Sequence, residues 1–182
     1  FIEWKYDAPL DWLLLDYDAH KQMQTYVKDL NKFYLKNSQF WEIDYSWEGF
    51  SWISNDDYNQ SIISFRRINK AGEEIICVCN FVPVDRSDYR IGVPISGNYK
   101  KVFSSSDQKY GGASGVADSY QSDNIAMHGY ENSISIDIPA LSVTYYKVPK
   151  KRKSTKKFIF VLFYPYIYYL IVILNPIFDC SF

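Results

Sequence analysis

Hydrophobic positions along the chain follow a helical period first and a strand period afterwards. Between Asp18 and Lys36, apolar and aromatic side chains recur every three or four residues, which predicts one amphipathic helix. Its apolar stripe consists of Met23, Tyr26, Val27, Leu30, Phe33 and Tyr34. Asp18 is predicted to cap the start of this helix, and Asn37 with Ser38 to end it. Residues 3–12 mix aromatic, acidic and proline side chains and predict an irregular loop before the helix.

After residue 49 the pattern changes to short apolar or alternating runs separated by turn residues. Strands are predicted at 50–53, 61–67, 74–81, 89–93, 99–104, 133–138 and 143–148, and turns at 55–57, 69–72, 96–98 and 130–132. Strands at this spacing favour an antiparallel β-sandwich over a parallel sheet, so the fold class is mainly β. The run 104–129 is polar and glycine-rich, and it predicts a long loop without secondary structure, which is typical of a functional segment.

The strand predicted at 133–138 alternates strictly. Ile134, Ile136 and Ile138 are expected to face the core, and Ser133, Ser135 and Asp137 to face water.

The segment 149–182 differs in composition from the rest of the chain. A basic block at 150–157 precedes a continuously apolar run at 158–174, whose length approaches that of a membrane-spanning helix. Pro165 lies near its centre, and the residues that dominate it are those that AT-rich codons specify. Two interpretations follow, a genuine tail anchor and an aberrant tail translated past a stop codon or in a shifted frame.

Charge and cysteine content narrow the classes of partner and compartment. The formal net charge is -1, so no overall electrostatic field favours nucleic acid. The three cysteines have no regular spacing, which favours a reducing, cytoplasmic setting over a disulfide-bonded secreted module. Cys77 and Cys79 are predicted to lie buried on one face of a strand. With His20 and His128 far apart in sequence, no metal site is predicted.

Aromatic residues make up 19% of the chain, with 17 Tyr, 12 Phe and 5 Trp. Flat aromatic rings either stack on sugar rings or fill a β-rich core, and composition alone leaves both readings open.

Four blocks of sequence, lying in order between about residue 2 and residue 148, carry a family resemblance. They are EWKYDAPLDWLLLDYDAHKQMQTYVKDLNKFY, EIDYSWEGFSWISNDD, CNFVPVDRSDYRIGVPISGNYKKVFSSSDQKYGG and HGYENSISIDIPALSVTYYKV. Together they resemble the C-terminal end of the 1,4-α-glucan branching enzymes, members of the α-amylase superfamily. In that family a catalytic (β/α)8 barrel is followed by an all-β C-terminal domain.

The resemblance implies a domain organisation. Residues 1–42 resemble the last loop and helix of the barrel, residues 43–148 resemble the all-β domain, and residues 149–182 form a basic and then hydrophobic tail. The partners implied are an α-glucan, glycogen, and the N-terminal barrel that this chain lacks, with a membrane involved only if the 158–174 run is a genuine anchor.

The resemblance also implies an activity, the transfer of an α-1,4-glucan segment to a sugar 6-hydroxyl to form α-1,6 branches. Such retaining transfer needs two carboxyl groups about 5 Å apart on a rigid scaffold, and no cofactor. In the family these carboxyl groups lie on barrel strands and loops upstream of the four blocks. No catalytic residue is therefore predicted here, and the chain alone is expected to be inactive.

The candidate substrate-binding residues are Trp4, Asp7, Asp11, Trp12 and Trp52. The resemblance places the first four at the substrate side of the barrel rim. Asp7 and Asp11 are expected to hydrogen-bond sugar hydroxyls between two indole walls, and capping of a helix end is the alternative. Trp52 is expected to stack on a glucan, with Trp47 and Tyr58 as neighbours, or else to fill the sandwich core.

Two further expectations concern the loop and the class of protein. Asp107, Tyr110 and Ser114 are expected to pack against the barrel rather than to contact the glucan, and His128-Gly129 is expected to form a turn. The rival class is a non-catalytic β-sandwich module that binds glucan, or that the 158–174 run anchors to a membrane. A debranching enzyme is less favoured, because the DYRIGVP and SSSDQKYGG blocks resemble branching enzymes in particular.

Overall fold

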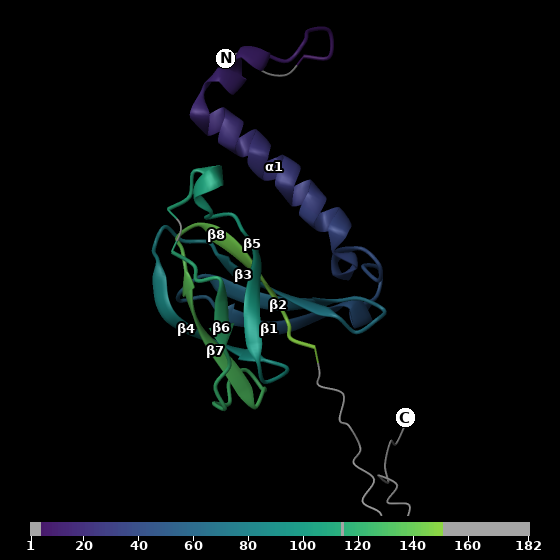
Figure 1. Cartoon of the computed structure of the whole chain (residues 1–182), viewed down its shortest axis with the longest axis vertical. Helices are drawn as coiled ribbons and strands as arrows, with labels where there is room; N and C mark the ends of the chain where they lie inside the picture. The colour runs from purple at the N-terminus through teal and green to yellow at the C-terminus, as the bar shows by residue number, and fades with distance from the viewer. Residues whose placement is uncertain (1–4, 114, 151–182) are drawn as a thin grey trace, which may run out of the picture. The chain divides into compact units, whose positions relative to one another are not determined.

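One long helix and two antiparallel sheets make up the part of the chain that the computed structural model describes, residues 5–113 and 115–150 (Figure 1). The helix is α1 (Asp18–Lys36), and the short 3-10 helices are η1 (Trp12–Asp16), η2 (Ser38–Phe40), η3 (Trp47–Gly49) and η4 (Gln108–Tyr110). The strands are β1 (Phe50–Asp57), β2 (Ile62–Ile68), β3 (Glu74–Asn80), β4 (Arg86–Val93), β5 (Asn98–Ser104), β6 (Ser119–Gln121), β7 (Asn132–Ile138) and β8 (Ser142–Lys147).

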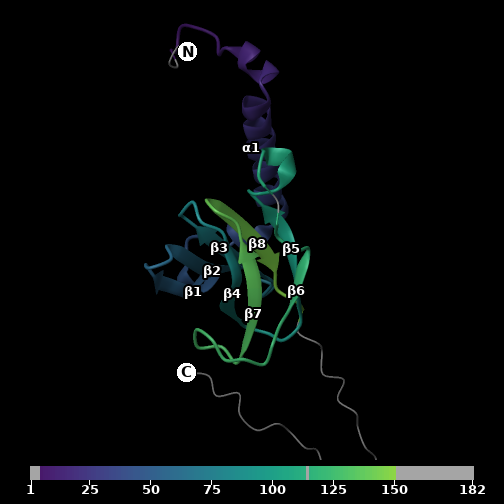
Figure 2. The same ribbon diagram turned by 90° about the vertical axis from the view of Figure 1, so that its left-hand side faces the viewer.

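The larger sheet has the strand order β1-β2-β3-β8-β5-β6, and the smaller one pairs β4 with β7. Their inner faces share one aliphatic core. Ile76, Val78 and Tyr146 of the larger sheet belong to the same buried cluster as Ile91 and Ile134 of the smaller sheet. The predicted antiparallel sandwich is therefore confirmed, and Figure 2 shows its strands from the side, with α1 extending above them.

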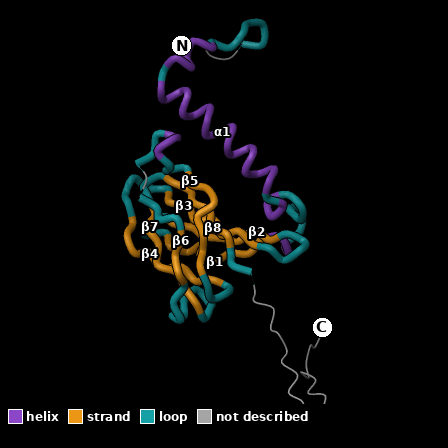
Figure 3. Tube along the Cα trace, viewed as in Figure 1, coloured by secondary structure: helices purple, strands orange, loops and turns teal. Residues whose placement is uncertain are grey.

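A second layer covers part of the outer face of the larger sheet. Phe33 of α1 stacks on Phe103 of β5, with ring centroids 5.0 Å apart, and its centroid lies 5.2 Å from that of Tyr145 of β8. Polar contacts add to this packing, because Lys109 Nζ donates to Asp29 Oδ2 of α1 at 3.0 Å. Helix and strands, distinguished by colour in Figure 3, are thus joined by an aromatic layer that is separate from the sandwich core.

Most predicted elements are confirmed, and the helix has the bounds that its periodicity indicated. Asp18, however, is not the cap. Tyr17 occupies that position without a side-chain hydrogen bond, and Asp18 lies in the first turn, where its charge favours the positive end of the helix dipole. Asn37 ends the helix as expected, and its backbone N–H donates to Tyr34 O.

Three strand-level predictions need correction. Residues 55–57 are not a turn, because β1 continues to Asp57 and pairs with Ile62. The 104–129 run contains η4 and β6, a short polar strand that pairs with β5 and has no hydrophobic period to announce it. Ser133 does not face water but is fully buried, and its hydroxyl accepts a hydrogen bond from Arg90 at 2.9 Å. The three isoleucines of β7 do face the core.

Among the described residues, no helix is long and apolar enough to cross a bilayer. The 158–174 run lies outside them, as do Trp4 and Ser114.

Candidate functional site

The candidate residues lie in two places at opposite ends of α1. Asp7, Asp11 and Trp12 precede the helix, whereas Trp52 lies in β1, which the chain enters after the helix has ended (Figures 1 and 2). A helix of 19 residues is about 28 Å long at 1.5 Å per residue. The structure therefore does not bring Trp52 together with the N-terminal candidates into one pocket.

At the N-terminal site, the backbone already uses one of the two carboxylates. Asp11 is the N-cap of η1, and its Oδ1 accepts a hydrogen bond from the Leu13 backbone N–H at 3.3 Å. The capping alternative thus has direct support for Asp11. Asp7 is exposed, and Trp12 exposes 62% of its surface. These groups lie where a further surface or a ligand could reach them.

Trp52 belongs to an aromatic row that crosses the outer face of the larger sheet. Residues directly opposite in antiparallel strands project from the same face. The register places Trp52 beside Phe65, Phe65 beside Cys77, Cys77 beside Tyr145, and Tyr145 beside Phe103. Phe33 of α1 covers the Phe103 and Tyr145 end of the row, whereas Trp52 at the other end keeps 46% of its surface exposed.

Two phenylalanines pack edge to face against the Trp52 ring. Its centroid lies 4.9 Å from that of Phe50 and 5.9 Å from that of Phe65, and both pairs are close to perpendicular. The next residue, Ile53, points the other way and belongs to the sandwich core. Trp52 is therefore not a core aromatic, and edge-to-face packing gives it a defined orientation at the surface.

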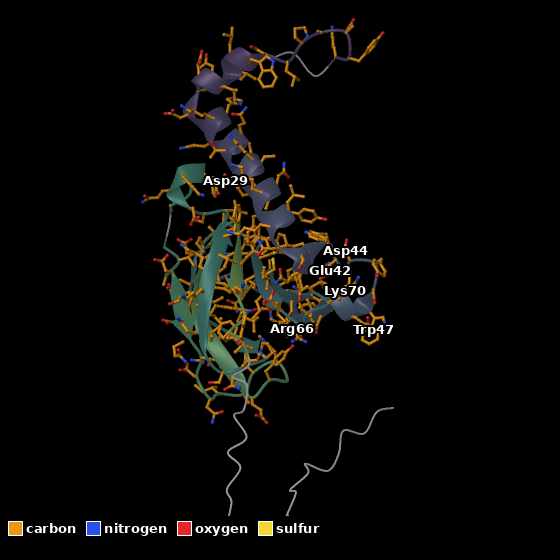
Figure 4. The ribbon with its side chains drawn as sticks, turned by 45° about the vertical axis from the view of Figure 1, so that its right-hand side comes forward. Asp29, Glu42, Asp44, Trp47, Arg66 and Lys70 are labelled. Carbon is orange, nitrogen blue, oxygen red and sulfur yellow. The ribbon has the colours of Figure 1, made fainter. Side chains whose placement is uncertain are left out.

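The segment 38–49, between α1 and β1, is tied to the β2–β3 hairpin by Arg67. The guanidinium donates to the backbone oxygen atoms of Gln39, at 3.4 Å, and Phe40, at 3.1 Å, and forms an ion pair with Asp44. On the hairpin turn, the backbone N–H of Lys70 donates to Glu42 Oε2 at 3.1 Å. Figure 4 shows Glu42, Asp44 and Lys70 at this junction.

The same segment carries exposed aromatic residues. Trp47 and Tyr45 each expose 84% of their surface, and Trp41 exposes 46%. Trp47 points away from the ribbon in Figure 4. Sequence reasoning included Trp47 but missed Trp41 and Tyr45. The signal that could have found them is the aromatic density of residues 40–52, which follows neither a helical nor a strand period.

A polar groove of about 550 Å³ lies on the other side of β1, between its C-terminal half and β4. Tyr89 donates to Asp57 Oδ2 at 2.6 Å, and burial followed by this carboxylate raises the pKa of Tyr89 well above its usual range. His128 Nδ1 accepts from the Gly92 N–H at 3.2 Å, and burial lowers the pKa of this imidazole. Tyr89 and Asp57 are thus bonded to each other, and His128 is bonded to the backbone of β4, so these side chains stabilise the wall of the groove.

The turn predicted at His128-Gly129 is confirmed. Both residues have positive φ, at 50° and 80°, and Met127 pairs with Tyr130 across them. Positive φ at both central positions is the geometry of a tight hairpin turn, which explains the glycine there. Within the described ranges, no group of three or more His, Cys, Asp or Glu residues could hold a metal ion.

The loop candidates contact α1 and the sheet. Tyr110 donates to Asp29 Oδ2 at 2.9 Å, and Lys101 Nζ lies 3.4 Å from Asp107 Oδ1. Hydrogen bonds from Lys109 and then Tyr110 lower the pKa of Asp29, and hydrogen bonds with Tyr110 and then Asp29 raise the pKa of Lys109. Tyr110 thus contacts α1, while the packing of this loop against the barrel stays a prediction.

An antiparallel sandwich of two sheets with a helix on the outer face of the larger one defines an all-β domain with one added helix. The sequence model of the family "Alpha amylase, C-terminal all-beta domain" matches residues 52–149, more than half of the chain. The chain belongs to this family.

Whole proteins show the same relationship. The chain is 49% identical over 150 residues to a 1,4-alpha-glucan branching enzyme of Halothermothrix orenii, a match that covers 81% of this chain and 24% of that enzyme. Branching enzymes of Aquifex aeolicus and Oceanobacillus iheyensis are 43% and 38% identical over 149 and 155 residues, again 24% of each enzyme. The resemblance read from the sequence is confirmed, and the chain spans about a quarter of the length of these relatives.

Proposed function

We propose that this chain acts as the C-terminal part of a 1,4-α-glucan branching enzyme, which transfers an α-1,4-glucan segment to a 6-hydroxyl and so forms α-1,6 branches in glycogen. The observation that carries the proposal is the identity of 49% to an enzyme of that name over 81% of the chain. The partners are then glycogen and the catalytic region of the same enzyme, in the cytoplasm. The chemistry calls for carboxylates and hydrogen bonds and not for a cofactor.

In this proposal, residues 1–42 close the barrel, residues 43–148 form the β domain, and residues 149–182 are an appendage. The surface of α1 supports the first assignment. One face of the helix packs on the sheet through Tyr26 and Phe33, while Val27 and Tyr34, seven positions apart on a neighbouring face, expose 46% and 45% of their surface. Apolar side chains left open on a helix mark a surface that packs against another element.

The candidate carboxylates would serve binding and not bond cleavage. Asp11 is committed to capping η1, and both carboxylates lie on one short segment without a rigid support. A retaining transferase holds its nucleophile and its acid on rigid strands. We therefore assign Asp7, Asp11 and Trp12, together with Trp4, to contacts with the glucan at the rim, while the catalytic carboxylates belong to the barrel.

Trp52 would act as a separate stacking surface for the glucan. Its ring packs against Phe50 and Phe65 and is nearly half exposed. Such a ring offers a flat apolar face with little rotational entropy left to lose on binding.

A chimaera tests the parent activity. Residues 1–148 replace the matching quarter of the Halothermothrix orenii enzyme, and new α-1,6 linkages are counted after enzymatic debranching. We expect the chimaera to branch amylose and the 182-residue chain alone not to do so. A folded chimaera without activity, or branching by the chain alone, would contradict the proposal.

A binding assay tests Trp52. In affinity electrophoresis through glycogen, the Trp52→Ala variant of the chain should lose most of the retardation. Burying the exposed apolar part of the Trp52 ring against a sugar is worth about 1–2 kcal/mol, which corresponds to roughly a 5- to 30-fold weaker affinity when the ring is removed. Phe81→Ala is the matched control, since Phe81 is an aromatic that is 60% exposed and lies after β3. Equal retardation of both variants would refute the assignment of Trp52. Strong binding by a chain whose chimaera is inactive would favour the non-catalytic glucan-binding class.

A further inference from the structure

The two cysteines of β3 form a thiol pair that the proposed function does not use. Their Sγ atoms lie 3.7 Å apart, and neither is in a disulfide. Residues two apart in a strand project from the same face. Val78 between them is fully buried in the sandwich core, so Cys77 and Cys79 project from the outer face, the one that α1 partly covers.

The two thiols differ in access. Cys77 is 1% exposed, whereas Cys79 is only partly buried and lines a groove of about 480 Å³. The walls of this groove come from α1, with Met23 and Tyr26, and from the sheet, with Phe81 and Val143. A small molecule that enters the groove therefore meets the sulfur of Cys79 and not that of Cys77.

The electrostatics of the pair point in the same direction. A hydrogen bond from the Cys77 thiol lowers the pKa of Cys79, and that bond together with burial raises the pKa of Cys77. The aromatic hydroxyl groups that face the pair belong to Tyr26 and Tyr145, and burial raises the pKa of both, so they stay neutral. Of the two sulfurs, Cys79 is thus the one whose pKa is shifted toward the thiolate, which is the reactive form of cysteine.

We propose that the pair is a redox modification site, in which Cys79 reacts with hydroperoxides and Cys77 resolves the product to a disulfide. The Cys79 thiolate attacks one peroxide oxygen, so that an S–O bond forms, the O–O bond breaks, and water or an alcohol leaves after taking up a proton. The Cys77 sulfur then attacks the Cys79 sulfur, an S–S bond forms, and the oxygen leaves as water with the Cys77 proton. Two thiols lose two electrons, and the peroxide gains them.

The position in the sheet makes this oxidation reversible. Cα atoms two residues apart in a strand are separated by about 6.6 Å, at the upper end of the range of about 4.4–6.8 Å seen in disulfides. β3 is hydrogen-bonded along its length to β2 and to β8, so it cannot shorten freely. The disulfide is therefore strained, and strained disulfides are the ones that small thiols reduce easily.

The experiment uses the full chain with Cys180→Ser, which leaves only the two thiols of β3. The protein is titrated with hydrogen peroxide, and the mass of the peptide that contains both cysteines is measured by mass spectrometry. We expect a loss of two hydrogens that dithiothreitol reverses. With dimedone present, the Cys77→Ser variant should form an adduct at Cys79. The Cys79→Ser variant should label Cys77 at a rate roughly tenfold lower.

Three outcomes would overturn the proposal: no reaction, stable oxygen addition at Cys79 without loss of the two hydrogens, or labelling of Cys77 as fast as that of Cys79. Thermal unfolding followed by circular dichroism shows whether each variant folds. If a variant does not fold, the mass measurement on the protein that keeps both Cys77 and Cys79 still tests the disulfide step. The proposal does not rest on the glucan activity, because its test measures the mass of the cysteine-containing peptide and involves no glucan.

Discussion

Asn80, at the end of β3, holds two connections of the sandwich through its side chain. It is 2% exposed. Its Nδ2 donates to Val84 O at 2.8 Å and to Pro139 O at 3.0 Å, and its Oδ1 accepts from the Val82 N–H at 3.1 Å. One amide thus joins the β3–β4 connection to the β7–β8 turn. The Asn80→Ala substitution removes all three hydrogen bonds and leaves their backbone partners without them.

The magnitude follows from the number of bonds. A net loss of about 1 kcal/mol for each bond gives about 3 kcal/mol in the free energy of unfolding. For a chain of this size, that corresponds to a fall in melting temperature of about 6–12 °C. Urea unfolding followed by tryptophan fluorescence measures this free energy, and an unchanged slope against urea shows that the unfolded state is the same.

Asn59→Ala is the matched control for Asn80→Ala. It removes an exposed asparagine in the β1–β2 turn and should stay within about 0.5 kcal/mol of the wild type. If Asn80→Ala costs less than about 1 kcal/mol, the amide does not join the two connections, and the reasoning is refuted.

Three other predictions follow from the packing. Gly92→Ala should destabilise the fold by about 1–3 kcal/mol in the same urea assay, because a Cβ at this position would lie 2.2 Å from Met127 O. At Gly72 a Cβ would meet no atom within 4 Å, so Gly72→Ala should cost only about 1 kcal/mol, for the strain of its φ of 71°. Phe33→Ala should weaken the packing of α1 on the sheet and lower the free energy of unfolding by about 3 kcal/mol. Amide hydrogen exchange should then be faster in α1 than in β3, and equal protection of the two elements would contradict this prediction. Asp29 has a lowered pKa, so its contact with Lys109 stabilises the fold above the usual aspartate range and is lost as the pH falls through the lower, folded-state value. The stabilities of the wild type and Asp29→Asn should converge in acid, and a constant difference across the pH range would show that the charge is not involved.

The local pattern of side chains was sufficient to predict most of the helices and strands. α1 has the bounds that its period predicted, and the three isoleucines of β7 face the core. Helical and strand periods are properties of a few neighbouring residues, so they can be recognised without knowing which segment packs against them. The pattern failed where pairing decided the outcome. β1 extends through Asp57 because β2 pairs with it, and β6 exists because β5 offers hydrogen bonds to a polar segment.

The candidate site shows the same division. The sequence identified Trp52 as an aromatic worth testing, and the Cys77 and Cys79 pair as residues on one face of a strand. It left open which face of each strand is covered, since alternation states only that neighbours point to opposite sides. The register across five strands places Trp52, Cys77 and Phe103 in one outer row, and α1 covers one end of it.

By itself, the sequence determined the helix, most of the strands and the family, because periodicity and short blocks of residues are local properties. Only the tertiary structure decided that Trp52 is exposed, that Ser133 is buried, and that Cys79 lies in a groove beside Cys77. Exposure depends on which distant segment packs against a surface, and that choice is made by the summed contacts of the whole fold.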